Sequence, residues 1–145
     1  MRQKLHDLTI ANAAPLMGPG ERALATGRCR VGKANVGRNV AMVAATAILS
    51  GGSMMMYQQK KAFYMLLTNE RLLILEAHWF TGRPTASAVA DIPRHVIRVA
   101  EAKRGVTATV ILALGTSGEG LRLSFPALDK EGADNLLRAL QYQAV

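Results

Sequence analysis

The stretch from residue 63 to residue 75 restricts the fold of this chain more than any other. Residues 63–67 and 72–75 are two apolar runs rich in strand-forming side chains, and the polar residues 68–71 separate them. Asn69 in the separator tolerates left-handed backbone and can bond its own chain, which favours a chain reversal. The pattern therefore predicts a tight β-hairpin.

Most of the chain after this hairpin repeats the same alternation of apolar runs and polar turns. Residues 85–90, 96–102, 106–114 and 121–125 read as strands, and 81–84, 103–105 and 115–120 read as turns. Pro126 ends this pattern. Asp129 then suits the N-cap of a last helix, whose apolar face is formed by residues at helical spacing: Ala133, Leu136, Leu137 and Leu140.

The chain before the hairpin predicts one more strand and one more helix. Residues 3–14 can form a short amphipathic helix that Pro15 stops. Residues 23–31 alternate between a small apolar face, which includes Cys29, and a face that carries Arg28 and Arg30. Residues 32–39 read as a loop. A chain of 145 residues fits a single domain. We therefore expect a mainly β fold, a bent antiparallel sheet or barrel of about seven strands capped by the C-terminal helix.

Nearly all of the formal net charge of +8 comes from one third of the sequence. Residues 22–69 hold seven bases and no acid: Arg22, Arg28, Arg30, Lys33, Arg38, Lys60 and Lys61. Such a block favours an anionic neighbour, which could be lipid head groups, nucleic acid or an acidic protein. A small basic protein can also carry such an asymmetry without using it.

Within this block, residues 27–34 come close to a nucleotide-binding loop. They match G-x-x-x-x-G-K, but Ala34 stands where a Ser or Thr would ligate magnesium. The rest of the chain also lacks the strand–helix alternation of a parallel sheet. A degenerate nucleotide-binding loop is therefore only a weaker alternative.

Residues 40–57 carry no charge and lie between Arg38 and the pair Lys60-Lys61. Their length would suit a transmembrane helix. Their strongly inserting side chains, Val40, Val43, Ile48 and Leu49, contribute only roughly −1 to −2.5 kcal/mol, and polar residues oppose them. We therefore expect an inserted Ala/Met-rich helix over residues 39–49, broken at 50–53. It could pack on the domain or on a second subunit, lie on or dip into a membrane, or span one.

The sequence offers no pattern for catalysis. His6, His78 and His95 fall on three different expected elements, and one cysteine cannot build a zinc site, so we expect no metal and no cofactor. No serine stands in a nucleophile elbow. Trp79 and Phe80 are expected to plug the core at the end of a hairpin. The acids Asp91, Glu101 and Glu119 are expected to be solvated, and Cys29 to be an inert small hydrophobe.

Residues 67–74, with the sequence LTNERLLI, resemble the LTN-x-R-L-hydrophobic hairpin of bacterial proteins with a pleckstrin-homology-like (PH-like) domain. Residues 92–99 resemble the bend into that family's middle strands, and the likeness covers roughly residues 21–141. It implies a highly bent antiparallel barrel of seven strands, closed at one end by the helix, and a role in binding or scaffolding. Residues 1–20 would be an N-terminal helix and linker, and residues 21–145 the PH-like domain with an insertion at 32–61.

The resemblance also suggests roles for single basic residues. Eukaryotic relatives bind phosphoinositides through the loop after the first strand, where Arg28, Arg30 and Lys33 lie in this chain, although no complete phosphoinositide motif is present. Arg71 is expected to lay its stem along the sheet and to bond nearby carbonyls.

The chain start has no apolar run behind its charges, so we expect a cytoplasmic protein that can be peripheral at the inner face of the membrane.

These observations predict a non-enzymatic binding or scaffold module that engages a protein partner or the anionic inner membrane surface. The expected anion-binding residues are Arg28, Arg30, Lys33, Arg38, Lys60 and Lys61, and the expected apolar interface is Val40, Val43, Ile48, Leu49, Met54, Met55 and Met56. A homo-oligomeric structural protein that uses residues 40–57 as its interface is the main alternative. Nucleic-acid binding is weaker, because no reading helix or stacking surface is visible.

Overall fold

The computed structural model describes residues 3–35, 62–115 and 119–144. The inserted helix, the expected apolar interface over residues 40–57, and the bases Arg38, Lys60 and Lys61 lie outside the described residues. The predictions that concern them therefore stay predictions.

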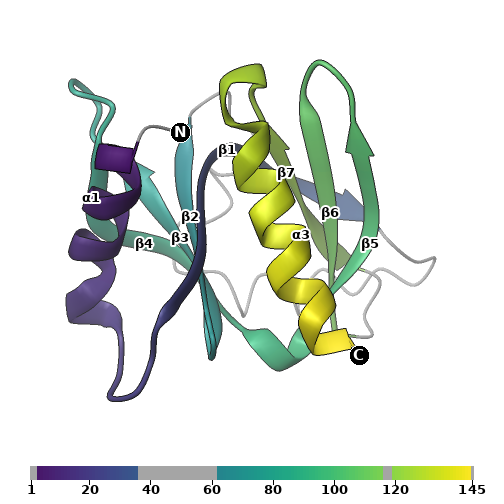
Figure 1. Cartoon of the computed structure of the whole chain (residues 1–145), viewed down its shortest axis with the longest axis horizontal. Helices are drawn as coiled ribbons and strands as arrows, with labels where there is room; N and C mark the ends of the chain where they lie inside the picture. The colour runs from purple at the N-terminus through teal and green to yellow at the C-terminus, as the bar shows by residue number, and fades with distance from the viewer. Residues whose placement is uncertain (1–2, 36–61, 116–118, 145) are drawn as a thin grey trace.

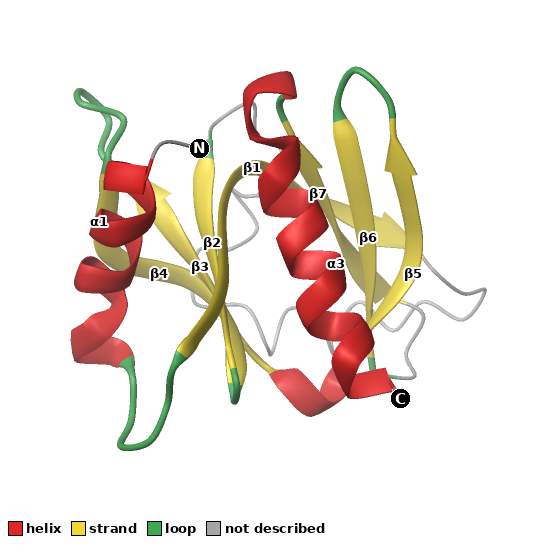
Figure 2. Cartoon of the chain, viewed as in Figure 1, coloured by secondary structure: helices red, strands yellow, loops and turns green. Residues whose placement is uncertain are grey.

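Seven antiparallel strands form one sheet in the order β4-β3-β2-β1-β7-β6-β5 (Figures 1 and 2). The strands are β1 (Ala23–Asn35), β2 (Phe63–Thr68), β3 (Arg71–Ala77), β4 (Pro84–Pro93), β5 (Ile97–Arg104), β6 (Ala108–Leu114) and β7 (Glu119–Phe125). The helices are α1 (Gln3–Ala13) and α3 (Lys130–Ala144), with short 3-10 turns η1 (Ala14–Leu16), η3 (Arg94–Val96) and η4 (Ala127–Asp129). The mainly β class is confirmed. The sheet stays open, with β4 and β5 at its edges, rather than closing into a barrel.

The long strand β1 joins the two halves of the sheet. Its first half pairs with β2 as far as Cys29 opposite Phe63, and its second half pairs with β7 from Arg30 opposite Ser124. Residues 32–35, which the sequence predicted as loop, therefore belong to the strand. Residues 27–34 are extended throughout, so the loop that a nucleotide phosphate would need is not formed and that interpretation is wrong.

The core lies between the inner face of the sheet and α3. Ala133, Leu136 and Leu140 are buried there, as the helical spacing predicted. A second cluster lies on the other face of β2 and β3, where α1 covers Tyr64 and Leu66. Since β2 is covered on both faces, all six of its residues are buried, which explains its continuous apolar run.

The first turn of α3 packs directly on β1 through two glycines. A Cβ added to Gly132 would lie 3.1 Å from the Gly27 Cα, so the two backbones touch. Asp129, which directly precedes α3, accepts a hydrogen bond from the Arg28 backbone N–H at 2.7 Å. The helix is thus positioned on the middle of β1.

The 68–71 turn reverses the chain as predicted, but Asn69 acts differently from our expectation. No non-glycine residue in the described ranges has a positive φ, so Asn69 is not left-handed. Its side chain bonds the neighbouring segment instead, since Oδ1 accepts the Arg22 N–H at 2.8 Å and Nδ2 donates to the Gly20 carbonyl at 3.3 Å. Thr68 supplies the turn chemistry, because its Oγ1 accepts the backbone N–H groups of Glu70 and Arg71.

Candidate functional site

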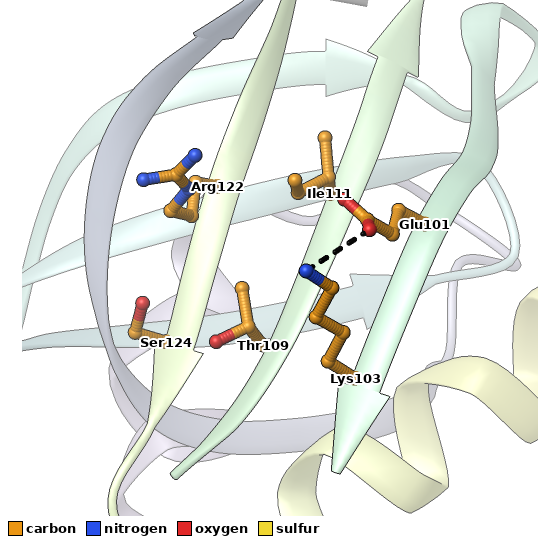
Figure 3. Close-up of a pocket in the computed structure, with 6 residues that line it drawn as sticks. All are labelled: Glu101, Lys103, Thr109, Ile111, Arg122 and Ser124. Carbon is orange, nitrogen blue, oxygen red and sulfur yellow. Dashed lines mark ion pairs between the residues drawn. The ribbon is translucent and has the colours of Figure 1, made fainter. Parts of the chain in front are cut away.

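A polar hollow of about 360 Å³ opens on the outer face of strands β5, β6 and β7 (Figure 3). Each of the three strands contributes two outward side chains, and the complete lining is Glu101, Lys103, Thr109, Ile111, Arg122 and Ser124. We call it the outer-face hollow. Two bases, two hydroxyls and one acid make it a site for a charged or polar group rather than an apolar one.

The register of the sheet places these side chains in two cross-strand rows. Lys103 lies opposite Thr109, Thr109 opposite Ser124, and Ser124 opposite Arg30 of β1. In the next row Glu101 lies opposite Ile111, and Ile111 opposite Arg122. Directly opposite residues have Cβ atoms about 5 Å apart. The first row therefore presents two hydroxyls between two bases.

Positive charge dominates this face. Lys103 Nζ lies 3.4 Å from a carboxylate oxygen of Glu101, and both side chains are largely exposed. An exposed ion pair of this kind contributes little to stability, so it can break when a ligand binds. Arg30 and Arg122 are exposed as well. Three bases against one acid favour an anionic ligand.

A second hollow of about 240 Å³ lies on the other side of the same strand end, between β5 and α3. The ion pair of Arg104 with Asp134, 3.3 Å long, lines it together with a mostly apolar wall: Ala102, Ala108, Val110, Ala133 and Leu137. We call it the helix-side hollow. Lys103 and Thr109 line both hollows. The last residues of β5 thus stand between a basic face and an apolar face.

Strand β5 forms an edge of the sheet. It pairs with β6 on one side, and no described strand pairs with its other side. Its residues from Ala100 to Arg104 are all exposed. An edge strand of this kind can accept an added strand, unless charges or a covering element prevent it.

The sequence located part of this site. Arg30 was predicted and borders the outer-face hollow, while Arg28 is exposed further along β1, with its guanidinium 6.0 Å from the centre of the Tyr64 ring. Lys33 is only partly exposed. Lys103, Arg122 and the two hydroxyls were missed. The strict alternation of residues 121–125 was the signal that could have placed Arg122 and Ser124 on one outward face.

Arg71 proves to be structural. Its Nε and Nη2 donate to the two carboxylate oxygens of Glu21 at 3.0 and 2.9 Å, and Nη1 donates to Asp91 at 3.0 Å. The expected bonds to carbonyls are replaced by carboxylates. Glu21 is itself buried and also accepts the Thr68 hydroxyl at 2.5 Å and the Gly18 N–H at 2.8 Å. This cluster ties the segment before β1 to the hairpin and engages all three guanidinium nitrogens of Arg71.

The Glu21 cluster predicts a stability that depends on pH. Burial raises the pKa of Glu21, but the hydrogen bonds from Thr68, Arg71 and Gly18 outweigh it and hold the pKa below its usual value. A carboxyl with a lowered folded pKa stabilises fully above its unfolded pKa of about 4.3, and this stabilisation is lost as the pH falls through the folded value. Glu21→Gln should lower the free energy of unfolding, measured with urea, by about 1.5–3 kcal/mol at neutral pH. The variant should also lose less stability than the native chain does when the pH is lowered. Glu131→Gln, at an exposed site, is the control; equal curves for both variants would contradict this.

Of four further side chains, three differ from the sequence-based expectation and one agrees with it. Trp79 and Phe80 are exposed, so they do not plug the core. Glu119 is buried, and its carboxylate oxygens have no hydrogen-bond partner among the described residues, so it is not a solvated acid. Cys29 is buried as predicted, and burial raises the pKa of its thiol.

No family model matches the sequence, and no curated protein is found as a relative. Within the described residues there is no cluster of three or more metal-ligating side chains. None of the helices in those ranges is both long and apolar enough to cross a membrane.

Proposed function

We propose that this chain is a non-enzymatic PH-like binding module that takes an extended, acidic segment of a protein partner as an added strand along β5. One observation carries this proposal: among the described strands the exposed end of β5 has a neighbour on one side alone, and it lies between a basic hollow and a mostly apolar one. The PH-like comparison is supported by the order of the strands, by the long β1 shared between both halves, and by the C-terminal helix packed on it.

The geometry of an added strand determines the chemistry of this segment. Side chains of an extended peptide alternate between the two faces of the sheet, so every second one would face the outer-face hollow and the others the helix-side hollow. Acidic side chains complement Lys103 on the first side, and Arg122 and Arg30, two and three strands further into the sheet, add to the positive field of that face. Small or branched apolar side chains complement Ala133 and Leu137 on the second. Main-chain hydrogen bonds to β5 would supply affinity that does not depend on sequence.

A synthetic peptide in which Glu and Val alternate is the matching probe. We expect it to raise the fluorescence anisotropy of its label when the full chain is added, whereas a peptide of alternating Lys and Val should not. Lys103→Glu, on β5 itself, should weaken binding roughly tenfold, because an attraction becomes a repulsion. Arg138→Glu makes the same charge change on α3, lines neither hollow, and should bind as the native chain does.

Backbone methylation of the probe separates strand addition from simple charge attraction. In an added strand, the backbone N–H groups of every second residue point toward β5, and those of the residues between them point away. One peptide would carry N-methyl groups on the first set of residues, and a second peptide would carry them on the other set. One methylated version should lose binding and the other should keep it. Equal binding of both versions, or equal loss for Lys103→Glu and Arg138→Glu, would reject the proposal.

A further inference from the structure

One end of the molecule displays large apolar side chains on three segments that are far apart in the sequence. The β3–β4 connection, η4 and the β5–β6 turn all reach the upper edge of the view in Figure 1. They carry Trp79, Phe80, Val106 and Leu128, which are 89%, 77%, 82% and 93% exposed. We call these four the tip residues. Four such side chains at one end are more than the scattered single exposures of ordinary surfaces.

The β3–β4 connection holds its aromatic rings outward in an ordered loop. The His78 and Arg83 backbones are joined at 2.7 Å, and Nδ1 of His78 accepts the N–H groups of Phe80 and Thr81 at 3.1 and 3.2 Å. From the sheet below, the buried Tyr64 hydroxyl donates to the Gly82 carbonyl at 2.5 Å. Gly82 has a φ of 71°, which an L side chain rarely adopts. These hydrogen bonds hold the loop in one conformation, in which the side chains of Trp79 and Phe80 are exposed and do not reach the core.

The rings themselves form a continuous apolar projection. The ring centroids of Trp79 and Phe80 are 5.5 Å apart in an edge-on arrangement, and His78 stacks on Trp79 with centroids 6.0 Å apart. Tryptophan combines a large apolar body with a polar N–H and is enriched where membranes meet water. The projection thus has the chemistry of a membrane interface anchor.

We propose that the tip residues insert into the head-group region of an anionic lipid bilayer. The charge of the chain complements such a surface, since the formal net charge is +8. Bases also surround the tips: Arg83 ends the β3–β4 connection, Lys103 and Arg104 lead into the β5–β6 turn, and Lys130 begins α3. Acids lie among them as well: Asp129 directly precedes Lys130, Glu76 lies near the end of β3, and Glu101 and Asp134 form exposed ion pairs with Lys103 and Arg104.

A bilayer accounts for the arrangement of the tips better than a protein partner does. The four side chains project from separate segments, and none of them lines either of the two hollows. A fluid head-group layer closes around each projecting side chain, whereas a protein would need a matching pocket for each. The two proposed sites share Lys103, so the test of the bilayer site relies on Phe80 and Arg83, which line neither hollow, and either proposal can still fail without the other.

Trp79 is the single tryptophan of the chain, so its fluorescence reports on this surface alone. Vesicles of phosphatidylcholine mixed with phosphatidylglycerol should shift its emission to the blue and should carry the 145-residue chain upward in a flotation assay. Lipids brominated near the head group should quench it. Vesicles of phosphatidylcholine alone should bind much more weakly, because each base near an anionic surface contributes about fivefold in affinity.

Two variants retain Trp79 as the reporter and test the two parts of the inference. Phe80→Ala should weaken vesicle binding about tenfold through lost apolar contact, and Arg83→Glu should weaken it at least fivefold on anionic vesicles only. Leu24→Ser is the matched control. Leu24 is a partly exposed apolar residue at the start of β1, a strand that begins at the lower side of the view, and its loss should leave binding unchanged.

Three outcomes would overturn the inference. The first is an emission maximum that no vesicle shifts. The second is binding that Leu24→Ser weakens as much as Phe80→Ala does. The third is an emission maximum that shifts with protein concentration alone, because the tips would then bury against a second copy of the chain. Circular dichroism of each variant establishes that it is folded before it is compared.

Discussion

Arg94→Ala should lower the free energy of unfolding by about 2–4 kcal/mol, among the largest effects of any single charge removal in this chain. Arg94 lies in η3 and is only 8% exposed. Its Nη1 donates to the Thr68 carbonyl at 2.9 Å and its Nη2 donates to the Ala139 carbonyl at 2.7 Å. One side chain thus joins the 68–71 turn to the C-terminal half of α3, where helix carbonyls favour a cation.

A short series of variants separates the hydrogen bonds of Arg94 from its packing. Burial lowers the pKa of Arg94, and its Nε lies buried with no hydrogen-bond partner among the described residues, so the charge is held at a cost. Arg94→Met keeps the apolar stem and removes that cost, and should therefore lose less stability than Arg94→Ala. Arg98→Ala, at an exposed position on β5, should change stability by less than about 0.5 kcal/mol. Urea unfolding measures all three; an Arg94→Ala curve that overlays that of Arg98→Ala would contradict the prediction.

The elements that sequence reasoning placed well are those whose signal is local. The hairpin of β2 and β3, the alternating β7 and the apolar face of α3 each depend on residues within a few positions of one another. The full length of β1 is not determined by such neighbouring residues. Residues 32–35 are rich in Gly and polar side chains and become strand only because β7, some ninety residues later, pairs with them. Whether the sheet closes into a barrel likewise depends on whether its edge strands β4 and β5 pair with each other. The alternation of apolar and polar residues within a strand does not determine this.

The candidate site was predicted less completely, for a related reason. Lys103-Arg104-Gly105 reads as a polar turn, yet the first two residues belong to β5, because an edge strand tolerates charges that a central strand would not. Trp79 and Phe80 were expected in the core because aromatic side chains are usually buried. The loop that displays them depends on the Tyr64 hydroxyl and on Gly82 at positive φ, a combination that only the folded chain brings together.

Gly27→Val should destabilise the chain by about 3 kcal/mol, because β1 and α3 meet there without room for a side chain. A Cβ on Gly27 would lie 2.8 Å from a ring carbon of Phe125 and 3.3 Å from the Gly132 Cα. Phe125 is fully buried and cannot swing away, so α3 would have to move. Any such movement also pulls Asp129 from the Arg28 N–H that it accepts.

Gly132→Ala tests the same contact from the helix, where two effects oppose each other. Alanine favours a helix over glycine by about 1 kcal/mol, but its Cβ would lie 2.8 Å from the Asp129 carboxylate and 3.1 Å from the Gly27 backbone. We expect the crowding, about 1–3 kcal/mol together with the loss of the Asp129 hydrogen bond, to prevail and the variant to be less stable. Gly32→Ala is the control on β1, since nothing lies within 4 Å of its added Cβ, and it should be neutral or slightly stabilising. If Gly27→Val and Gly32→Ala unfolded at the same urea concentration, the close packing of α3 on β1 would not be what holds the helix in place.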